Sequence, residues 1–289
     1  MRRCFALFLV SLLPLFMSAQ APAAMPEVKV MTFNIRTASP KDGDNVWENR
    51  RDRVANAIKF YDADIIGMQE VRPTQLTDLT ARLAGYDKVS KGRFCDGSTR
   101  DEHCTLWFKA SRFNLLDSGT FWISETPEKT ASKGWDGAYP RIATWAKLHD
   151  RVSGHDLLAV NTHLDHRGKQ ARREGTRMLI HKVRELADGL PIVLTGDFNA
   201  NMQDVPYKEI TDTSNPDHLT DSRTAANLIY GPAWSFHDFG RQALDKREII
   251  DYLFVGGPLK VNRYGILAET EGRQFLSDHN PILISLIIL

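Results

Sequence analysis

Two hydrophobic patterns alternate along the first half of the chain. Residues 28–35 (VKVMTFNI) alternate as a half-buried β-strand does, and residues 44–64 place apolar side chains roughly on one face of a helix. Residues 64–71 (DIIGMQEV) form a short apolar run typical of a buried strand, and residues 72–87 have the pattern of a second helix, ended by Gly85. The chain is therefore predicted to begin as strand, helix, strand and helix.

Strands dominate the second half of the chain. Residues 106–122 predict paired strands that turn near Ser111, and residues 169–189 predict the longest helix. Further strands are predicted at residues 142–148, 157–163, 191–198, 249–255, 261–267 and 281–289. This mixture predicts a layered α/β sandwich with more than one sheet rather than a doubly wound parallel sheet. Since no repeat or linker interrupts residues 28–289, we expect one domain over residues 25–289.

The first 24 residues follow a different pattern. Two arginines precede an apolar run from Phe5 to Met17, and small residues follow, which is the order of a secretory signal peptide. The run is too short to cross a bilayer comfortably. We expect residues 1–24 to be a signal peptide cleaved near Ala23, so that the mature chain is secreted or periplasmic and has no transmembrane segment. A retained N-terminal anchor is the alternative.

Composition and charge narrow the function. The chain is 42% apolar and 25% charged, as in ordinary globular proteins. Without Arg2 and Arg3 it has 35 basic residues against 36 acidic ones, a net charge of −1. Proteins that act on nucleic acid usually carry a basic surplus, so this charge disfavours DNA or RNA as partner while leaving a local basic patch open. We expect a monomer.

Cysteine usage predicts one disulfide. Loss of Cys4 with the signal leaves Cys95 and Cys104 on either side of a polar loop. In an exported protein such an even pair predicts a disulfide, which would stabilise the chain by about 2–3 kcal/mol through loop entropy. The alternative is a metal site that also uses His103, although two thiols and one histidine at this spacing match no common zinc pattern.

Acidic, amide and imidazole residues recur at one end of six apolar runs. These residues are Asn34, Glu70, His163 with Asp165, Asp197 with Asn199, Asp251, and Asp278 with His279. A single such residue is usually a satisfied core polar group, because burying a lone carboxylate costs several kcal/mol. Six strand ends in shared sheets would converge instead. A cluster rich in carboxylates and poor in Lys and Arg requires a cation, and oxygen ligands favour Mg²⁺, Mn²⁺ or Ca²⁺.

The segment PIVLTGDFNA shows what the cluster could do. Residues two apart on an extended chain face the same side, so Asp197 and Asn199 could hold one small group, such as a water, between them. An ionised carboxylate can take a proton from that water while the amide fixes its position. The sequence thus predicts a water-activating pair at the end of a buried strand.

Six motifs together carry a family resemblance. MTFNIR, IIGMQEV, NTHLDH, LTGDFNA, IIDYLFV and SDHNPI resemble, in order, the motifs of the endonuclease/exonuclease/phosphatase (DNase I-like) superfamily, from about Lys29 to the C-terminus. GDFN followed far downstream by SDH is the specific pair. The resemblance implies a four-layer α/β/β/α sandwich with two packed mixed β-sheets. It also implies hydrolysis of a phosphate ester with Mg²⁺ or a similar ion.

The resemblance also implies roles for individual residues. It assigns the metal to Asn34, Glu70 and Asp278, the nucleophilic water to Asp197 and Asn199, the phosphate contact to His279 oriented by Asp251, a second active-site imidazole to His163, and the substrate side to Glu102 and Arg141. The loop of residues 125–139 is long for a connector, so we expect it to border the substrate. Histidines outside these motifs, among them His237, are expected on the surface or in loops.

Four functions remain open at this point. The first is an exported metal-dependent phosphoesterase that cleaves a phosphate mono- or diester. The second is an extracellular nuclease, which the near-zero charge disfavours. The third is a sphingomyelinase-like phosphodiesterase, which would need an exposed apolar hairpin that the sequence does not clearly show. The fourth is a non-catalytic binding subunit, which would have no need of a water-activating aspartate.

Overall fold

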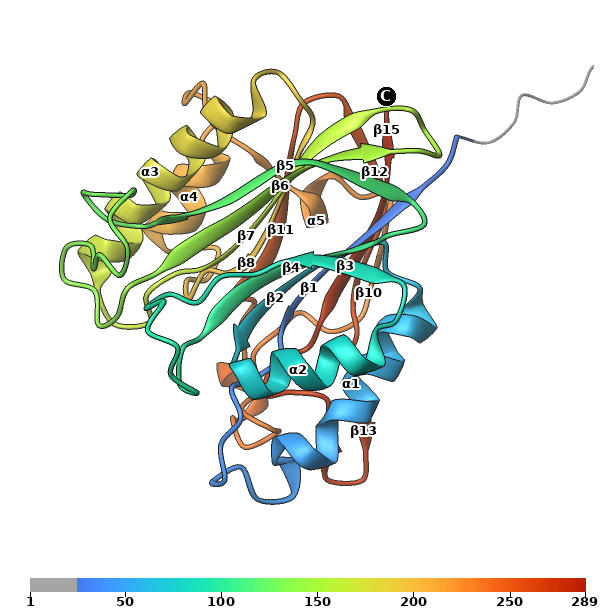
Figure 1. The fold of residues 1–289 in the computed structure, drawn as a ribbon, viewed down its shortest axis with the longest axis vertical. Coiled ribbons are helices and arrows are strands. Elements are labelled where there is room, and N and C mark those ends of the chain that lie inside the picture. Colours follow the sequence, from blue (N-terminus) through green and yellow to red (C-terminus); the bar gives the residue numbers. More distant parts are fainter. Residues whose placement is uncertain (1–24) are drawn as a thin grey trace, which may run out of the picture.

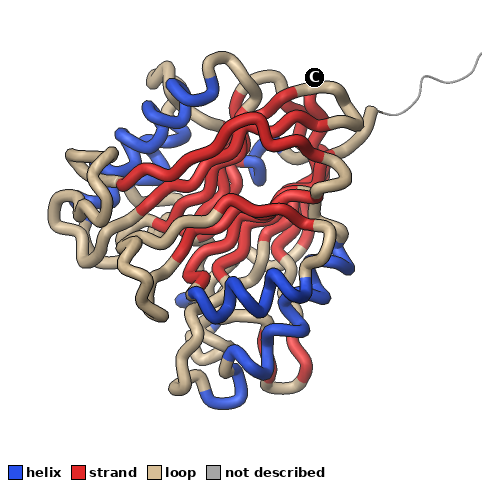
Figure 2. The backbone as a smooth tube through the Cα atoms, in the orientation of Figure 1, coloured by secondary structure: helices blue, strands red, loops and turns tan. Residues whose placement is uncertain are grey.

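Two β-sheets pack face to face at the centre of the molecule, and helices cover their outer faces (Figure 1; Figure 2). The structure is a computed structural model that describes residues 25–289, so the predicted signal peptide lies outside the described residues. The layers confirm the predicted α/β/β/α sandwich. Within residues 25–289, none of the helices combines the length and apolar character of a membrane span.

The first sheet has seven strands in the order β10–β12–β15–β1–β2–β4–β3. Their bounds are β1 Val28–Asn34, β2 Ile65–Val71, β3 Tyr86–Val89, β4 His103–Lys109, β10 Leu228–Tyr230, β12 Leu259–Ile266 and β15 Ile282–Ile288. β1 runs parallel to β2 and antiparallel to β15, so the sheet is mixed. The helices α1 (Trp47–Tyr61) and α2 (Pro73–Arg82) cover its outer face (Figure 1).

The second sheet has six strands in the order β5–β6–β7–β8–β11–β9. Their bounds are β5 Phe113–Trp122, β6 Ile142–Asp150, β7 Asp156–His163, β8 Ile192–Asp197, β9 Thr220–Asp221 and β11 Asp251–Gly256. The long helix α3 (Lys169–Ala187) connects the parallel strands β7 and β8 and packs with α4 (Val205–Thr211) on the outer face (Figure 1). The shorter elements are α5 Ser222–Ala225, β13 Thr270–Glu271 and β14 Gln274–Phe275.

The central strands are buried on both faces, as their near-continuous apolar runs require. In β1, Val30 belongs to the core between the sheets, whereas Met31 packs in the core beneath α1 and α2. A polar network lies between the sheets near the strand ends: Gln69 Nε2 donates to Asn161 Oδ1 at 2.7 Å. A Cβ on Gly67 would overlap the Thr195 side chain, so this glycine allows the two sheets to approach closely.

Two local predictions were wrong. Residues 106–122 do turn near Ser111, but β4 pairs with β2 and β3 while β5 pairs with β6, so the chain crosses from one sheet to the other there. The second predicted helix ends earlier than expected, and the short strand β3 follows it. Pairing partners are set by packing between distant segments, which a local pattern does not contain.

The predicted disulfide is absent, because Cys95 and Cys104 are both free thiols. Cys104 is the second residue of β4, and its side chain is buried in a small cluster with Trp122, where burial raises its thiol pKa to about 12. Cys95 is exposed in the loop. Asp101 holds that loop instead, accepting hydrogen bonds from the amides of Phe94 and Cys95 at 2.8 Å each.

Candidate active site

The second sheet places three of the predicted residues in a row. His163 at the end of β7 is opposite Asp197 at the end of β8, and Asp197 is opposite Asp251 at the start of β11. Directly opposed residues on neighbouring strands point to the same face of a sheet. The strand register by itself therefore brings two carboxylates and an imidazole together. All three side chains are more than nine-tenths buried.

Residues of the first sheet reach the same point. Asn34, the last residue of β1, donates from Nδ2 to Asp197 Oδ2 at 2.9 Å and to Glu70 Oε1 at 3.2 Å. Glu70 has a left-handed backbone with φ of 63°, and the β2–β4 register shifts between Met68 and Val71. Such a bulge redirects a side chain at the edge of an active site. Asn34 therefore joins the carboxylates of the two sheets.

The geometry after β8 differs from the predicted one. The predicted pairing of Asp197 with Asn199 assumes an extended backbone through both residues. The strand β8 ends at Asp197, however, and Asn199 has φ of 47°, so the backbone is no longer extended there. The Asn199 amide nitrogen donates to Asp197 Oδ1 at 2.9 Å, and its Nδ2 donates to the Leu164 carbonyl at 3.0 Å. Asn199 still lines the cavity described below, but it contacts Asp197 through its backbone.

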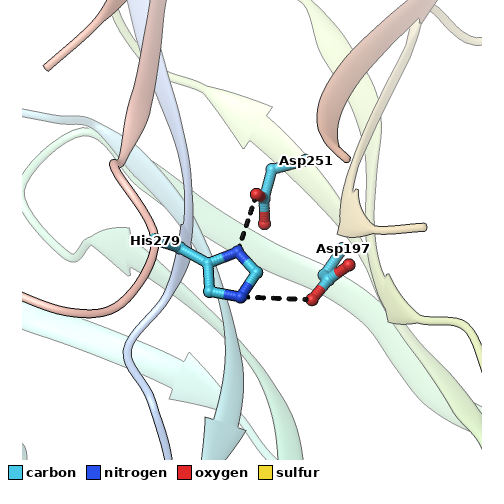
Figure 3. A group of neighbouring side chains, drawn as sticks. All are labelled: Asp197, Asp251 and His279. Carbon is cyan, nitrogen blue, oxygen red and sulfur yellow. Dashed lines mark hydrogen bonds and ion pairs between the residues drawn. The ribbon is translucent and has the colours of Figure 1, made fainter. Parts of the chain in front are cut away.

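Two imidazoles flank Asp197 and differ in charge. His279 Nδ1 lies 2.8 Å from Asp251 Oδ2, and its Nε2 lies 3.9 Å from Asp197 Oδ2 (Figure 3). Burial would lower the His279 pKa, but Asp251 and Asp197 raise it to about 10. His163 Nε2 lies 3.5 Å from Asp197 Oδ2. Burial and the nearby Arg141 charge hold the His163 pKa well below its usual value, so this ring is neutral.

Burial disfavours the ionised form of the carboxylates at this site. Burial and the charge of Asp251 raise the pKa of Asp197 to about 7. Burial, together with the charge of Glu70, also raises the pKa of Asp278. Burial would raise the Glu70 pKa as well, but the Thr37 amide, at 2.8 Å from Oε2, helps to hold it below its usual value. The site therefore has acidic groups that additional positive charge would stabilise.

A divalent cation fits this site. Asp197, Asp251 and His279 bring ligand atoms within 4.8 Å of one another. In this group, however, His279 forms a hydrogen-bonded ion pair with Asp251, and Asp197 is the neighbouring acid (Figure 3). A protonated imidazole cannot bind metal. Glu70 and Asp278 fit better, because both line the cavity and offer the oxygen ligands that Mg²⁺, Mn²⁺ and Ca²⁺ prefer.

A cavity of about 490 Å³ opens over these residues. Eight of the ten predicted site residues line it: Glu70, Glu102, Arg141, His163, Asp197, Asn199, Asp278 and His279. Asn34 and Asp251 stand behind the cavity surface, hydrogen-bonded to Asp197 and His279. The structure thus gathers the ten residues in one place, while their individual catalytic roles stay predictions.

Other cavity residues were not predicted from the sequence. They include Arg36, Arg93, Tyr139, His166, Phe236 and Asp238. Arg36 and His166 belong to the motifs MTFNIR and NTHLDH, so their place in these motifs could have indicated that they lie at the site. Arg93 lies in a loop that contains no such motif. Tyr139 ends the loop expected to border the substrate. His237 lies in a loop, as expected, but its side chain is almost fully buried and accepts a hydrogen bond from the Gly240 amide.

The family model for endonuclease/exonuclease/phosphatase proteins matches residues 31–279. The chain belongs to this family. Its members are hydrolases that act on phosphate esters, among them nucleases and phosphatases. The match covers every predicted site residue and both sheets apart from β15 and the first three residues of β1.

Solved structures of this family are close to this one. An endonuclease/exonuclease/phosphatase from Bacteroides vulgatus is 40% identical with a TM-score of 0.87, over 91% of this chain and 100% of that one. A mannosyl-6-phosphatase from Bacteroides thetaiotaomicron VPI-5482 is 33% identical with a TM-score of 0.82, over 90% and 99%. Among curated relatives, the CCR4-Not complex 3'-5'-exoribonuclease subunit Ccr4 of Coccidioides immitis (strain RS) is 28% identical over 163 residues. That match covers 49% of this chain and only 21% of the relative.

Proposed function

We propose that this chain is an exported, divalent-metal-dependent phosphoesterase in which Asp197 activates the water that attacks phosphorus. The observation that carries the proposal is the environment of Asp197. Its carboxylate accepts a hydrogen bond from Asn34 and lies between a neutral and a cationic imidazole, those of His163 and His279. It faces a cavity large enough for a small phosphate ester.

Each side chain has a chemical task in this mechanism. With a pKa near 7, Asp197 is partly ionised at neutral pH and can accept the proton of a water. The His279 imidazolium, held at Nδ1 by Asp251, directs Nε2 toward the cavity, where it would donate to a phosphate oxygen. Glu70 and Asp278, with the help of Asn34, would hold Mg²⁺, Mn²⁺ or Ca²⁺. The bound ion would neutralise phosphate charge and assist the leaving oxygen.

A substrate panel tests this proposal. Purified protein is assayed with Mg²⁺, Mn²⁺ or Ca²⁺ against p-nitrophenyl phosphate, bis(p-nitrophenyl) phosphate, sugar phosphates, sphingomyelin, DNA and RNA. We expect turnover of at least one ester that EDTA and Asp197→Asn both abolish. Asp188→Asn is the matched control, because Asp188 is exposed and left-handed at the end of α3, where asparagine is equally accepted. Undiminished turnover by Asp197→Asn would reject the mechanism.

Export is part of the same proposal and has its own test. We expect the full chain, expressed in a bacterial host, to yield a periplasmic or secreted product whose new N-terminus lies near residue 24, and we expect that product to be a monomer. N-terminal sequencing and light scattering check both points. A full-length product retained in the membrane fraction would favour the uncleaved anchor instead.

An exoribonuclease is the second candidate function, because the curated relatives include Ccr4 subunits. A surface hollow of about 560 Å³ between the starts of α3 and α4 is lined by Lys169, Arg172 and Arg173, which could contact a phosphate backbone. If RNA is the substrate, we expect its hydrolysis in the panel to exceed that of the small esters. We also expect that hydrolysis to fall steeply with added salt.

A further inference from the structure

One wall of the cavity carries side chains that the proposed mechanism does not use. We call Arg93, Tyr139, Arg141 and His166 the arginine wall. The Arg93 guanidinium lies 4.7 Å from the centroid of the Tyr139 ring, and that ring stacks on His166 at 6.0 Å with an interplanar angle of 17°. His166 Nδ1 lies 3.1 Å from Arg141 Nη2. Two cations are thus held in place, Arg93 by its contact with the Tyr139 ring and Arg141 by its contact with His166, the ring stacked on Tyr139.

Both arginines are buried with hydrogen-bonding capacity left over. Arg93 is 7% exposed and Arg141 is 6% exposed, and among residues 25–289 the Nε of each lacks a hydrogen-bond partner. Arg93 pairs with Glu102 at 2.9 Å, while Arg141 Nε is 3.5 Å from Asp165 Oδ2. A guanidinium has five N–H donors, so these contacts leave several unused. A buried cation with unused donors is typical of a site that receives an anion.

The arginine wall and the water-activating aspartate line the same cavity. After burial, the charges of Arg141 and Arg93 are the largest contributions that lower the pKa of His163. His163 itself is 3.5 Å from Asp197. Arg141 directly precedes β6, and His166 follows β7, so the wall stands at the β6–β7 side of the cavity. An anion bound to the wall would therefore occupy the cavity that Asp197 faces.

We propose that the arginine wall binds a non-bridging oxygen found only in a terminal phosphate, so that the substrate is a phosphate monoester and Arg93 selects for it. This inference rests on the proposed phosphoesterase function. A monoester has three non-bridging oxygens and carries close to two negative charges near neutral pH. A diester has two such oxygens and one charge. Its second organic group would have to lie against two buried guanidinium groups, and it supplies neither the charge nor the non-bridging oxygen that they would bind.

Arg93→Met tests the inference, because methionine keeps an unbranched side chain and removes the charge. We measure kcat/KM with Mg²⁺ for p-nitrophenyl phosphate, a monoester, and bis(p-nitrophenyl) phosphate, a diester. We expect the monoester value to fall about 10- to 100-fold, as for loss of a hydrogen bond to a charged group, while the diester value stays within about threefold. Competitive inhibition by inorganic phosphate should weaken by a similar factor to the monoester loss. Arg177→Met, on the exposed face of α3, is the matched control.

A second variant separates selection from simple damage to the fold. Arg93→Met leaves the Glu102 carboxylate without its partner, so Arg93→Met/Glu102→Gln removes both charges. We expect the double variant to show the same lost preference for the monoester. Recovery of the wild-type preference in the double variant would overturn the inference, as would an equal fall for both esters in Arg93→Met.

Wild-type rates distinguish failure of this inference from failure of the proposed function. If the wild-type protein hydrolyses the diester faster than the monoester, the inference is wrong and the phosphoesterase function stands. If it hydrolyses neither ester, nor any other ester of the substrate panel, with any of the three metal ions, the proposed function fails and the inference fails with it.

Discussion

The two packed sheets carry buried charged residues at both ends of their strands, and the two ends differ in how those charges are paired. At one end, Asp64 accepts from Lys109 at 2.8 Å and from Arg112 at 2.9 Å, and Arg112 also pairs with Asp150 at 2.9 Å. At the other end, burial raises the pKa of Asp197 and Asp278, which lack such a complete set of partners.

The comparison shows that a carboxylate at a strand end does not by itself mark a functional site. Asp64 and Asp150 are buried like Asp197, yet the chain supplies their counter-charges. The acids around the cavity are stabilised only in part by His279 and Arg36, which leaves them suited to a metal ion and a phosphate. Incomplete pairing next to a cavity, rather than acidity, is the informative property.

The largest expected effect comes from Asp197→Asn. We expect kcat to fall about a thousandfold, within the usual range for removing a general base. The melting temperature should stay the same or rise, because the substitution removes a carboxylate that is costly to bury. Activity assays and calorimetry check this. Asp64→Asn should give the reverse result, with a lower melting temperature and normal activity.

Arg112→Met removes the cation at the end of the sheets where the buried charges are paired. It leaves Asp64 and Asp150 buried without their shared partner, so we expect the free energy of unfolding to fall by about 3 kcal/mol. Urea denaturation measures this change, and kcat measured well below the melting temperature should be unchanged. A loss of activity in folded Arg112→Met would mean that the two ends are coupled and that the comparison is wrong.

Much of this architecture could be predicted from the sequence. Central strands such as β1, β2 and β8 are buried on both faces, so their apolar runs identify them directly, and polar residues that stop those runs must lie at the strand ends. That is why Asn34, Glu70 and Asp197 were found. Asp64 and Asp150 also stand at strand ends. Their structural role became visible only from pairing with Arg112, which the sequence does not show.

The remainder depends on contacts between distant segments. The chain crosses between sheets near Ser111, and β3 forms only because β4 provides a neighbour for it. Arg93 lies in an irregular loop and gains its place at the cavity through Tyr139 and Glu102. The backbone turn at Asn199 cancels the period-two geometry assumed for it. Local periodicity carries no signal for any of these.

Metal binding should act at the cavity end alone. We expect Mg²⁺ to raise the melting temperature, with a stabilisation of about 2.7 kcal/mol at a hundredfold excess over the dissociation constant. Glu70→Gln should remove most of this shift, whereas Asp64→Asn should keep it, although both replace an acid of the same strand region. A shift that survives Glu70→Gln unchanged would place the ion elsewhere.

The pH dependence of stability should have opposite signs at the two ends. Hydrogen bonds from Arg112 and Ser153 outweigh burial and lower the pKa of Asp150, so its stabilising contribution is present above about pH 4 and is lost as the pH falls through its lowered pKa. Asp197 has a pKa raised to about 7, so in metal-free protein its contribution is greatest below about pH 4 and is lost as the pH rises toward 7.

Denaturation across pH in EDTA separates these contributions. Asp150→Asn should flatten the decline of unfolding free energy on the acid side, and Asp197→Asn should flatten the decline between about pH 4 and 7. The sign differs because one carboxylate gains partners on folding and the other mainly loses water. If the unfolding free energy of wild type and of Asp197→Asn changed equally with pH in that range, the pKa of Asp197 would not be raised on folding. Its neighbours would then compensate its charge fully, which would remove the main reason for expecting a metal ion beside it.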